Sequence, residues 1–370
     1  MTPAADELLP EQSELLHDLP AAGHHLVDGP PGSGKSALAV HRALALAHGG
    51  HRVALVSRSN LLRQRLQRDL NSAPGATAVP VTTYHKWVID WHRRSTGAEI
   101  RFSSDGSFDW DALAASAISL TAPPEREWLV VDEGQDLPVQ FYLLCRLLGT
   151  HLTVFADEYQ CITDQQSTLA EISQALGAPS RHTIAGNLRN SRQISRLAQE
   201  FTLDRTSVKH PEREGPLPSL MPLARLSQTA RWIAEVAAAH RGQSTGVILR
   251  HTQGQKDLLG ELARVAPRLK TQTYIASAPE GRYRTVDASR PGLTLVNRAS
   301  AKGLEFDTVV VPDTHLDTGD PTAAAIRMLY YVMATRARHR LYFGYAGPEE
   351  PPMLAHIPPF LLERPKPKSR

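Results

Sequence analysis

The feature that most constrains the fold of this chain is a glycine-rich segment, GPPGSGKS, which runs from Gly29 to Ser36. It matches the pattern G-x-x-x-x-G-K-[ST] at every fixed position. The apolar run 24–29 predicts a strand before it, and the segment 35–48 predicts a helix after it. A strand, a glycine-rich turn and a helix in this order form a phosphate-binding loop, because backbone N–H groups of the turn and of the helix N-terminus surround an anion.

The side chains of this loop have expected roles in binding a nucleoside triphosphate. Lys35 is expected to reach the β and γ phosphates, and the Ser36 hydroxyl to ligate Mg²⁺. The alternative is a chance match on an unrelated loop, which the flanking strand and helix disfavour. The residues expected to bind nucleotide here are Gly29, Pro30, Pro31, Gly32, Ser33, Gly34, Lys35 and Ser36.

Strands and helices alternate along the chain, which predicts an α/β protein. Most of the strand-like runs are continuously apolar, as in strands buried on both faces of a parallel sheet. In the first half these runs are 24–29, 52–57, 78–85, 127–133 and 151–157, with a polar surface insertion expected at 102–126. A second α/β unit is predicted from near residue 181, with helices 189–201, 228–240, 255–264 and 321–337 and strands 246–250, 292–297, 308–312 and 340–345. The predicted domains are therefore 1–180 and 181–347, followed by a Pro-rich basic tail at 348–370.

Length and composition exclude several classes of protein. The 370 residues suffice for two domains, and no segment approaches the ~20 uncharged apolar residues of a membrane helix. The acidic N-terminus lacks the basic and apolar regions of a signal peptide. The two cysteines, Cys145 and Cys161, cannot build a disulfide framework or a Cys-based zinc site, so a reducing cytoplasm is the expected compartment. A net charge of +3 is too small to indicate nucleic-acid binding, and the excess of Arg over Lys fits phosphate recognition and GC-rich coding equally.

A pair of candidate catalytic carboxylates ends the predicted strand 127–133, in the sequence VVDEGQD. Such a position is the edge where α/β sheets bind ligands. Asp132 is placed to hold Mg²⁺ through water, and Glu133 to take a proton from an attacking water. Adjacent carboxylates favour hydrolysis over phosphoryl transfer to another substrate. The alternative, a solvated acidic loop, is disfavoured by the phosphate loop in the same chain.

These two motifs and several others, in the same order, resemble those of the UvrD/Rep-type superfamily 1 DNA helicases. The segment from Asp132 to Asp136 is similar to the DEAQD box of that family, with Gly134 in place of Ala. The resemblance spans roughly residues 9–345. The other similar boxes are Leu9-Pro-Glu-Gln12, Thr83-Tyr84-His85-Lys86-Trp87, Phe155-Ala-Asp157-Glu-Tyr-Gln160-Cys-Ile162, Asn187-Leu-Arg189-Asn190, Ser300-Ala-Lys302-Gly303-Leu304-Glu305-Phe306-Asp307 and Leu329-Tyr330-Tyr331-Val332-Met-Ala-Thr335-Arg336-Ala337.

The resemblance implies a pair of RecA-like domains with ATP and Mg²⁺ in the cleft between them. Gln12 would read the adenine edge, and Glu305 would touch the ribose or the neighbouring phosphates. Gln135 and Gln160 would contact the γ-phosphate or the attacking water and couple it to the bound strand. Two residues of the second domain, Arg189 and Arg336, would serve as arginine fingers, which stabilise charge on the transferring phosphoryl group.

The nucleic-acid contacts implied by the resemblance are Arg58, Tyr84 and His85. From the residues alone, a solvated helix face explains Arg58 equally well, and closely spaced aromatics at a strand-to-helix turn often pack in a core. Of the two aromatics here, Tyr84 is expected in the nucleic-acid channel and Trp87 in the core. The departures from the family fall mainly on the nucleic-acid side of the motifs. Leu188 replaces an aromatic that stacks on adenine, and Thr163 replaces a tyrosine. The large accessory insertions are also missing, which makes the chain a minimal form of the family.

The implied function is an ATP-dependent translocase or helicase that hydrolyses Mg-ATP. It would act on single-stranded DNA, with RNA left open, and would move 3′ to 5′. A protein partner would replace the missing accessory domains, and no membrane is involved. The alternative is an ATP-gated switch, or regulatory ATPase subunit, in a genome-defence or repair assembly with little unwinding of its own. A phosphate-loop kinase is disfavoured by Glu133, Gln135 and the two finger arginines.

Overall fold

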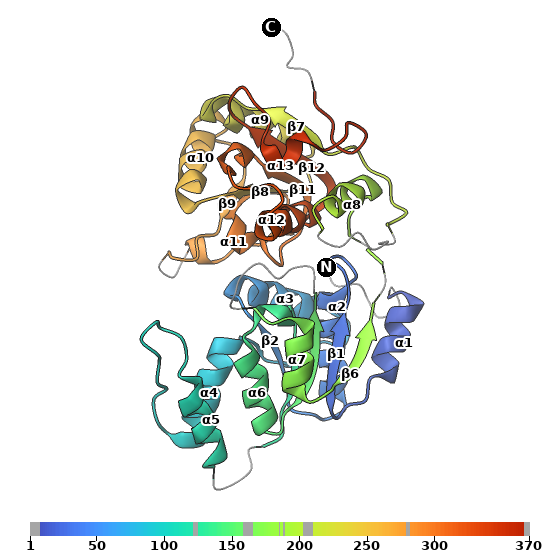
Figure 1. Cartoon of the computed structure of the whole chain (residues 1–370), viewed down its shortest axis with the longest axis vertical. Helices are drawn as coiled ribbons and strands as arrows, with labels where there is room; N and C mark the ends of the chain where they lie inside the picture. The colour runs from blue at the N-terminus through green and yellow to red at the C-terminus, as the bar shows by residue number, and fades with distance from the viewer. Residues whose placement is uncertain are drawn as a thin grey trace. The chain divides into compact units, whose positions relative to one another are not determined.

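A computed structural model describes residues 8–120, 125–157, 166–184, 186–187, 189–202, 210–278 and 282–365 of the chain. The chain divides into two compact units, Met1–Ala185 and Gly186–Arg370 (Figure 1). Each unit holds its own parallel sheet with helices on its faces, so the predicted α/β class with two RecA-like domains is confirmed. Among the described residues, no helix is long and apolar enough to cross a membrane.

The first unit is built on a six-stranded sheet in the order β3-β2-β4-β5-β1-β6, in which all pairs are parallel. Its short strands are mostly buried, as their Val- and Leu-rich sequences predict. The strands are β1 (His24–Asp28), β2 (Val53–Ser57), β3 (Val81–Thr83), β4 (Trp128–Val131), β5 (His151–Ala156) and β6 (Ser180–Thr183). The helices are α1 (Pro10–Asp18), α2 (Lys35–His48), α3 (Asn60–Ser72), α4 (Tyr84–Thr96), α5 (Trp110–Ile118), α6 (Val139–Leu147) and α7 (Leu169–Leu176), with a 3-10 turn η2 (Gly134–Asp136).

Two apolar cores, one on each face of this sheet, hold the helices in place. One core joins α4, α5, α6 and α7 to the sheet through side chains such as Trp87, Leu113 and Phe141. The other joins α2 and α3 through side chains such as Leu38 and Leu66. This sandwich fixes the loops that follow β1, β4 and β5, which lie together at the carboxyl edge of the sheet.

Three predictions about the first unit are corrected by the structure. The expected strand 78–85 is reduced to β3, because the Thr83 side chain accepts a hydrogen bond from Lys86 N and starts α4 there. The segment 102–126 is more than a surface insertion, since it contains α5 and buries Phe108 and Leu113 in the core. Strand β6 was not predicted because its side chains are mostly exposed; it pairs with β1 at the sheet edge.

The second unit is built on another all-parallel six-stranded sheet, in the order β7-β12-β11-β8-β10-β9. Its strands are β7 (Ser219–Pro222), β8 (Ser244–Leu249), β9 (Thr271–Thr273), β10 (Gly292–Asn297), β11 (Phe306–Val311) and β12 (Ala337–Tyr345). Its helices are α8 (Arg192–Gln199), α9 (Leu226–Ala239), α10 (Thr252–Val265), α11 (Arg298–Ala301), α12 (Ala324–Thr335) and α13 (Pro352–Ala355), with 3-10 turns η4 (Arg282–Arg284) and η5 (Thr314–Leu316). The short edge strands β7 and β9 lie in stretches that the sequence left without a strand.

The described part of the Pro-rich tail packs against this second unit. Helix α13 buries Met353 and Leu354, and Leu362 is also buried. The backbone O of Glu363 accepts a hydrogen bond from Leu220 N at 2.8 Å, which attaches the tail to β7. The structure therefore places residues up to Pro365 within the second compact unit, although the predicted domain boundaries themselves stay a prediction.

Candidate active site

The phosphate-binding loop joins β1 to α2 and has a backbone shape that requires glycine. Gly32 and Gly34 have φ angles of 82° and 92°, in the left-handed region. A Cβ on Gly34 would also lie 2.7 Å from Nε2 of Gln12. Helix α2 begins directly at Lys35, so the N–H groups of its first turn have no partner within the helix. The loop thus has the form of an anion cradle at a helix N-terminus.

The Lys35 ammonium is buried in this loop and bonded to three acceptors. Its Nζ lies 2.5 Å from Gly29 O, 2.9 Å from Pro30 O and 3.4 Å from Oδ2 of Asp157. Asp157, which follows β5, is fully buried. The structure therefore places Lys35 at the carboxyl edge of the sheet, as predicted, and adds a carboxylate partner that the sequence reading did not assign.

Gln12 lies beside the same loop at the first turn of α1. Its side chain is buried, its Nε2 donates to Ser33 O at 2.9 Å, and its Oε1 accepts from Leu9 N at 3.0 Å. These bonds close the N-terminus of α1 against the phosphate loop. Ser33 contributes a buried hydroxyl for which no hydrogen-bond partner is found. A contact between Gln12 and an adenine edge stays a prediction.

Asp132, at the end of β4, has the properties of a metal-binding carboxylate. It is 1% exposed, and within the described part of the chain neither carboxylate oxygen meets a hydrogen-bond partner in good geometry, although the Ser36 hydroxyl is close by. Burial, followed by the negative charge of Glu133, raises the pKa of the Asp132 carboxyl to about 7, while the Ser36 hydroxyl, Arg65 and Lys35 lower it. A buried carboxylate without partners is costly unless a cation compensates it, so these oxygens fit Mg²⁺.

The surroundings of Asp132 are compatible with Mg²⁺, which needs only a few ligands from the protein. The described residues contain no cluster of three or more His, Cys, Asp or Glu side chains that could hold a metal. Mg²⁺ is usually bound by one or two protein oxygens together with phosphates and water. Ser36 and Asp132 provide such a pair, since the Ser36 hydroxyl lies close enough to Asp132 to lower the pKa of its carboxyl.

Glu133 is held by a short chain of hydrogen bonds. Nε2 of Gln135 donates to Oε2 of Glu133 at 2.6 Å, and Oε1 of Gln135 accepts from Asp157 N at 2.9 Å. Glu133 has a positive φ of 55°, which is uncommon for a residue other than Gly, Asn or Asp. Such strain persists where the surrounding structure fixes it, and it is concentrated at functional sites.

The glycine that departs from the DEAQD box has a steric explanation. A Cβ on Gly134 would lie 2.3 Å from Cγ1 of Val154 and 2.9 Å from the hydroxyl of Tyr142. That hydroxyl donates to Gly134 O at 2.5 Å. Val154 on β5 and the hydroxyl of Tyr142 on α6 therefore occupy the space that an alanine methyl group would need, and glycine restores the fit.

The three predicted nucleic-acid residues lie together next to this loop. The Arg58 charge acts on both Tyr84 and His85, and Arg58 Nη1 donates to Asp136 O at 2.9 Å. Partial burial of the imidazole, and then the Arg58 charge, lower the pKa of His85. As a whole residue, His85 is still exposed. Tyr84 is buried against Phe141, and its contact with nucleic acid stays a prediction.

In the second unit, Arg189 and Glu305 are brought together. Nη2 of Arg189 lies 2.6 Å from Oε1 of Glu305, and Nη2 of Arg338 lies 2.9 Å from its other oxygen. Arg336 is instead almost fully buried: its guanidinium donates to Val332 O at 3.0 Å and to the Thr335 hydroxyl at 3.2 Å. Both finger assignments stay predictions, and the structure adds Arg338 as a neighbour of one of them.

The structure does not describe some of the positions singled out in the sequence, and it adds two residues to which the sequence analysis gave no role. Gln160, Thr163 and Leu188 lie outside the described residues. Asp157 and Arg338 had no assigned role, although both stand in or beside quoted boxes. For Asp157 a signal was available, since it is a carboxylate directly after a buried strand, as Asp132 is.

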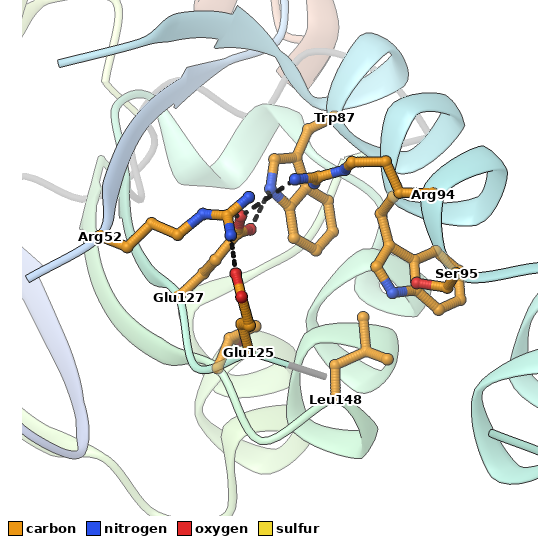
Figure 2. A pocket seen from close by; sticks show the side chains of 9 residues that line it. Arg52, Trp87, Arg94, Ser95, Glu125, Glu127 and Leu148 are labelled. Carbon is orange, nitrogen blue, oxygen red and sulfur yellow. Dashed lines mark hydrogen bonds and ion pairs between the residues drawn. The ribbon is translucent and has the colours of Figure 1, made fainter. Parts of the chain in front are cut away.

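A separate pocket lies at the opposite edge of the first sheet, before the starts of β2, β4 and β5 (Figure 2). Arg52 lies between two carboxylates there: it pairs with Glu125 and, at 3.0 Å, with Glu127. Glu127 also accepts from Trp87 Nε1 at 3.1 Å and lies 3.6 Å from Arg94. These interactions fasten α4 to the sheet, so the cluster has a structural role away from the phosphate loop.

Comparison with known families matches both units. Residues 12–166, which include the phosphate loop and the DEGQD segment, match an AAA domain. Residues 293–343, which include Glu305 and Arg336, match the UvrD-like helicase C-terminal domain. Together these matches support a UvrD-like helicase. The resemblance inferred from the boxes is thereby confirmed.

This UvrD-like helicase is an ATP-hydrolysing enzyme of the DNA helicase type. Among solved structures, the C-terminal domain of a possible DNA helicase from Lactobacillus plantarum WCFS1 is similar at 22% identity. The similarity covers 48% of this chain and 97% of that one, with a TM-score of 0.36. No curated protein matches the sequence.

Proposed function

We propose that this UvrD-like helicase is an ATP-driven translocase on single-stranded DNA that hydrolyses Mg-ATP. The observation that carries the proposal is the convergence of Lys35, Asp132, Glu133 and Gln135 at one edge of the first sheet, beside the phosphate loop. Each of these residues suits one requirement of phosphoryl transfer to water. Movement from 3′ to 5′ is proposed from the family resemblance alone.

In this proposal, the phosphate loop and Lys35 bind the β and γ phosphates. Ser36 and Asp132 would hold Mg²⁺, which neutralises charge on the phosphate oxygens when it is bound. The buried Asp132 carboxylate, with the Ser36 hydroxyl close to it, supports this assignment. Because burial raises the pKa of Asp132 to about 7, binding of the cation also keeps this carboxyl in its charged form.

Glu133 is proposed as the general base that takes a proton from the attacking water. Gln135 holds one carboxylate oxygen at 2.6 Å, which restricts the rotation of Glu133 and orients it. A base must be fixed within hydrogen-bond reach of the proton that it removes. Gln135 and Gln160 would contact the γ-phosphate or the attacking water.

The second unit is proposed to supply charge stabilisation. Arg189 and Arg336 would act as arginine fingers, and Glu305 would contact the ribose or neighbouring phosphates. Arginine suits this task because its guanidinium presents several donors to phosphate oxygens at once. Such fingers are worth ~10³ or more in turnover.

Arg58 and His85 are proposed to contact the nucleic acid, with Arg58 binding backbone phosphate. Arg58 is already tied to Asp136 O, so a strand bound here would touch the loop that carries Glu133. Binding mainly through arginine and phosphate is steeply salt-dependent. A protein partner would supply surfaces for strand separation, and the isolated chain is expected to unwind duplex poorly.

The test is ATP turnover with and without single-stranded DNA, followed by translocation toward each labelled end of the strand. Strong stimulation and arrival at the 5′ end are expected. Lys35→Ala should abolish turnover, whereas Lys256→Ala, which removes an exposed lysine on α10, should leave it unchanged. Turnover that is indifferent to DNA would reject the translocase in favour of an ATP-gated switch, and RNA in place of DNA tests the substrate.

A further inference from the structure

Each N–H bond of the Lys35 ammonium already has an acceptor within the protein. An ammonium group has three N–H bonds. Three acceptors surround Nζ: Gly29 O at 2.5 Å, Pro30 O at 2.9 Å and Asp157 Oδ2 at 3.4 Å. A phosphate that binds Lys35 must therefore replace at least one of them.

Asp157 is the acceptor most suited to be replaced. Its distance to Nζ is the longest of the three, and its negative charge is of the same kind that a phosphate brings. The two carbonyl acceptors belong to the phosphate loop itself and move with Lys35. Replacement of Asp157 by phosphate thus exchanges one anion for another around the same ammonium.

Loss of the contact between Asp157 and Lys35 is unfavourable, which favours its return when the phosphate leaves. Asp157 is fully buried, and separating a buried carboxylate from a cation is unfavourable. The backbone of Asp157 is also bonded to Gln135, which in turn holds Glu133. The residue that competes for Lys35 is therefore attached to the residue that orients the general base.

We propose that Asp157 is a positioning residue that competes with the bound phosphates for Lys35 and draws Lys35 back when they leave. The inference rests on the proposed ATP site. In this role, the Asp157 carboxylate lowers the affinity of the site for nucleotide and speeds the release of product. The nearby Gln135 and Glu133 keep their own arrangement, because their link to position 157 runs through its backbone N–H.

Asp157→Asn tests this role, because it removes the charge and keeps both the shape and the backbone N–H. Because the variant no longer competes with phosphate for Lys35, we expect it to bind ADP about tenfold more tightly. KM for ATP should fall, and turnover should fall with it because ADP leaves slowly. Fluorescent ADP titration, ADP release in stopped flow and steady-state turnover measure the three quantities.

Two controls separate the competition from general effects. In a Lys35→Ala background the competition is gone, so Asp157→Asn should tighten ADP by less than about threefold, leaving only direct repulsion. Asp257→Asn, an exposed carboxylate on α10, should change nothing. Thermal unfolding of each variant shows whether the fold is kept.

The outcomes are distinct. Tighter ADP binding that depends on Lys35 supports the proposal. Unchanged or weaker ADP binding in a folded Asp157→Asn protein overturns it and makes the carboxylate merely structural. If instead Lys35→Ala keeps normal turnover, the proposed ATP site itself fails, whatever Asp157→Asn does.

Discussion

Nη2 of Arg189 and Oε1 of Glu305 form an ion pair of 2.6 Å inside the second unit. Arg338 binds the other oxygen of the same carboxylate at 2.9 Å. Glu305 therefore keeps a cationic partner if Arg189 turns toward a phosphate, which lowers the cost of that movement. This arrangement leads to a different expectation for each of the two proposed fingers.

Arg189→Ala is expected to lower ATP turnover by ~10³ and ATP affinity much less, because a finger acts mainly in the transition state. The fold should keep its stability, since Arg338 still pairs with Glu305. Steady-state turnover and equilibrium nucleotide binding measure the two effects. Arg192→Ala is the matched control. It removes a surface ion pair between Arg192, at the start of α8, and Glu214, and it should behave as wild type. Normal turnover in Arg189→Ala would end its assignment as a finger.

Arg336→Ala should lose turnover and also stability. Its side chain is 1% exposed and its guanidinium donates to Val332 O and to the Thr335 hydroxyl, so truncation removes these buried bonds and leaves a cavity. We expect a loss of about 1–3 kcal/mol in the free energy of unfolding. Urea unfolding checks this value, and Arg189→Ala provides the comparison. Full stability in Arg336→Ala would mean that these buried bonds contribute nothing.

Glu133→Gln should bind ATP and fail to hydrolyse it. Gln can still accept the bond from Gln135 Nε2, so the loop should keep its shape while the base is lost. A filter or fluorescence assay should show retained ATP binding beside absent phosphate release. Glu214→Gln, an exposed glutamate, should retain turnover. If the variant also loses nucleotide binding, Glu133 serves the metal or the fold rather than the proton transfer.

Asp132 should make stability depend on pH. Its pKa in the folded protein is raised to about 7 from the ordinary value of 3.8, first by burial and then by Glu133, so the folded state binds this proton more tightly than the unfolded state. The stabilisation is therefore complete below the unfolded pKa and is lost as pH rises toward about 7. Thermal unfolding without Mg²⁺ should show this loss in wild type and not in Asp132→Asn.

Saturating Mg²⁺ with ADP should remove most of that difference at neutral pH, because the cation stabilises the charged carboxylate. The same addition should stabilise Asp132→Asn less. A wild-type unfolding temperature that follows pH in parallel with the variant would show that Asp132 titrates normally.

Gly134→Ala should destabilise the first unit, even though the related box carries Ala. The new Cβ would lie 2.3 Å from Cγ1 of Val154, and overpacking of this kind costs about 1–3 kcal/mol. Gly260→Ala is the control: it lies within α10, where nothing surrounds a Cβ within 4 Å, so it should be neutral or stabilising by up to about 1 kcal/mol. Combining Gly134→Ala with Val154→Ala, which removes the nearest clashing atom, should cost less than the sum of the two single substitutions.

Local signals in the sequence were sufficient for the elements and the motifs. The glycine spacing from Gly29 to Ser36 predicted the phosphate loop, because positive φ angles and close backbone approach are properties of single residues. Apolar runs predicted β1, β2, β4, β5 and the main strands of the second unit, because burial on both faces leaves a continuous pattern. The order of the boxes predicted the family that the matches to both units confirm.

Pairing between distant residues was decided only by the tertiary structure. Strand β6 has an exposed sequence and is recognised only by its pairing with β1. The contact of Asp157 with Lys35, the bond from Asp157 N to Gln135 and the sharing of Glu305 by two arginines join separate segments. The burial of Tyr84 and Arg336 likewise depends on what packs over them. Composition and periodicity report what each residue prefers, whereas the parallel sheets determine which carboxylate meets which cation.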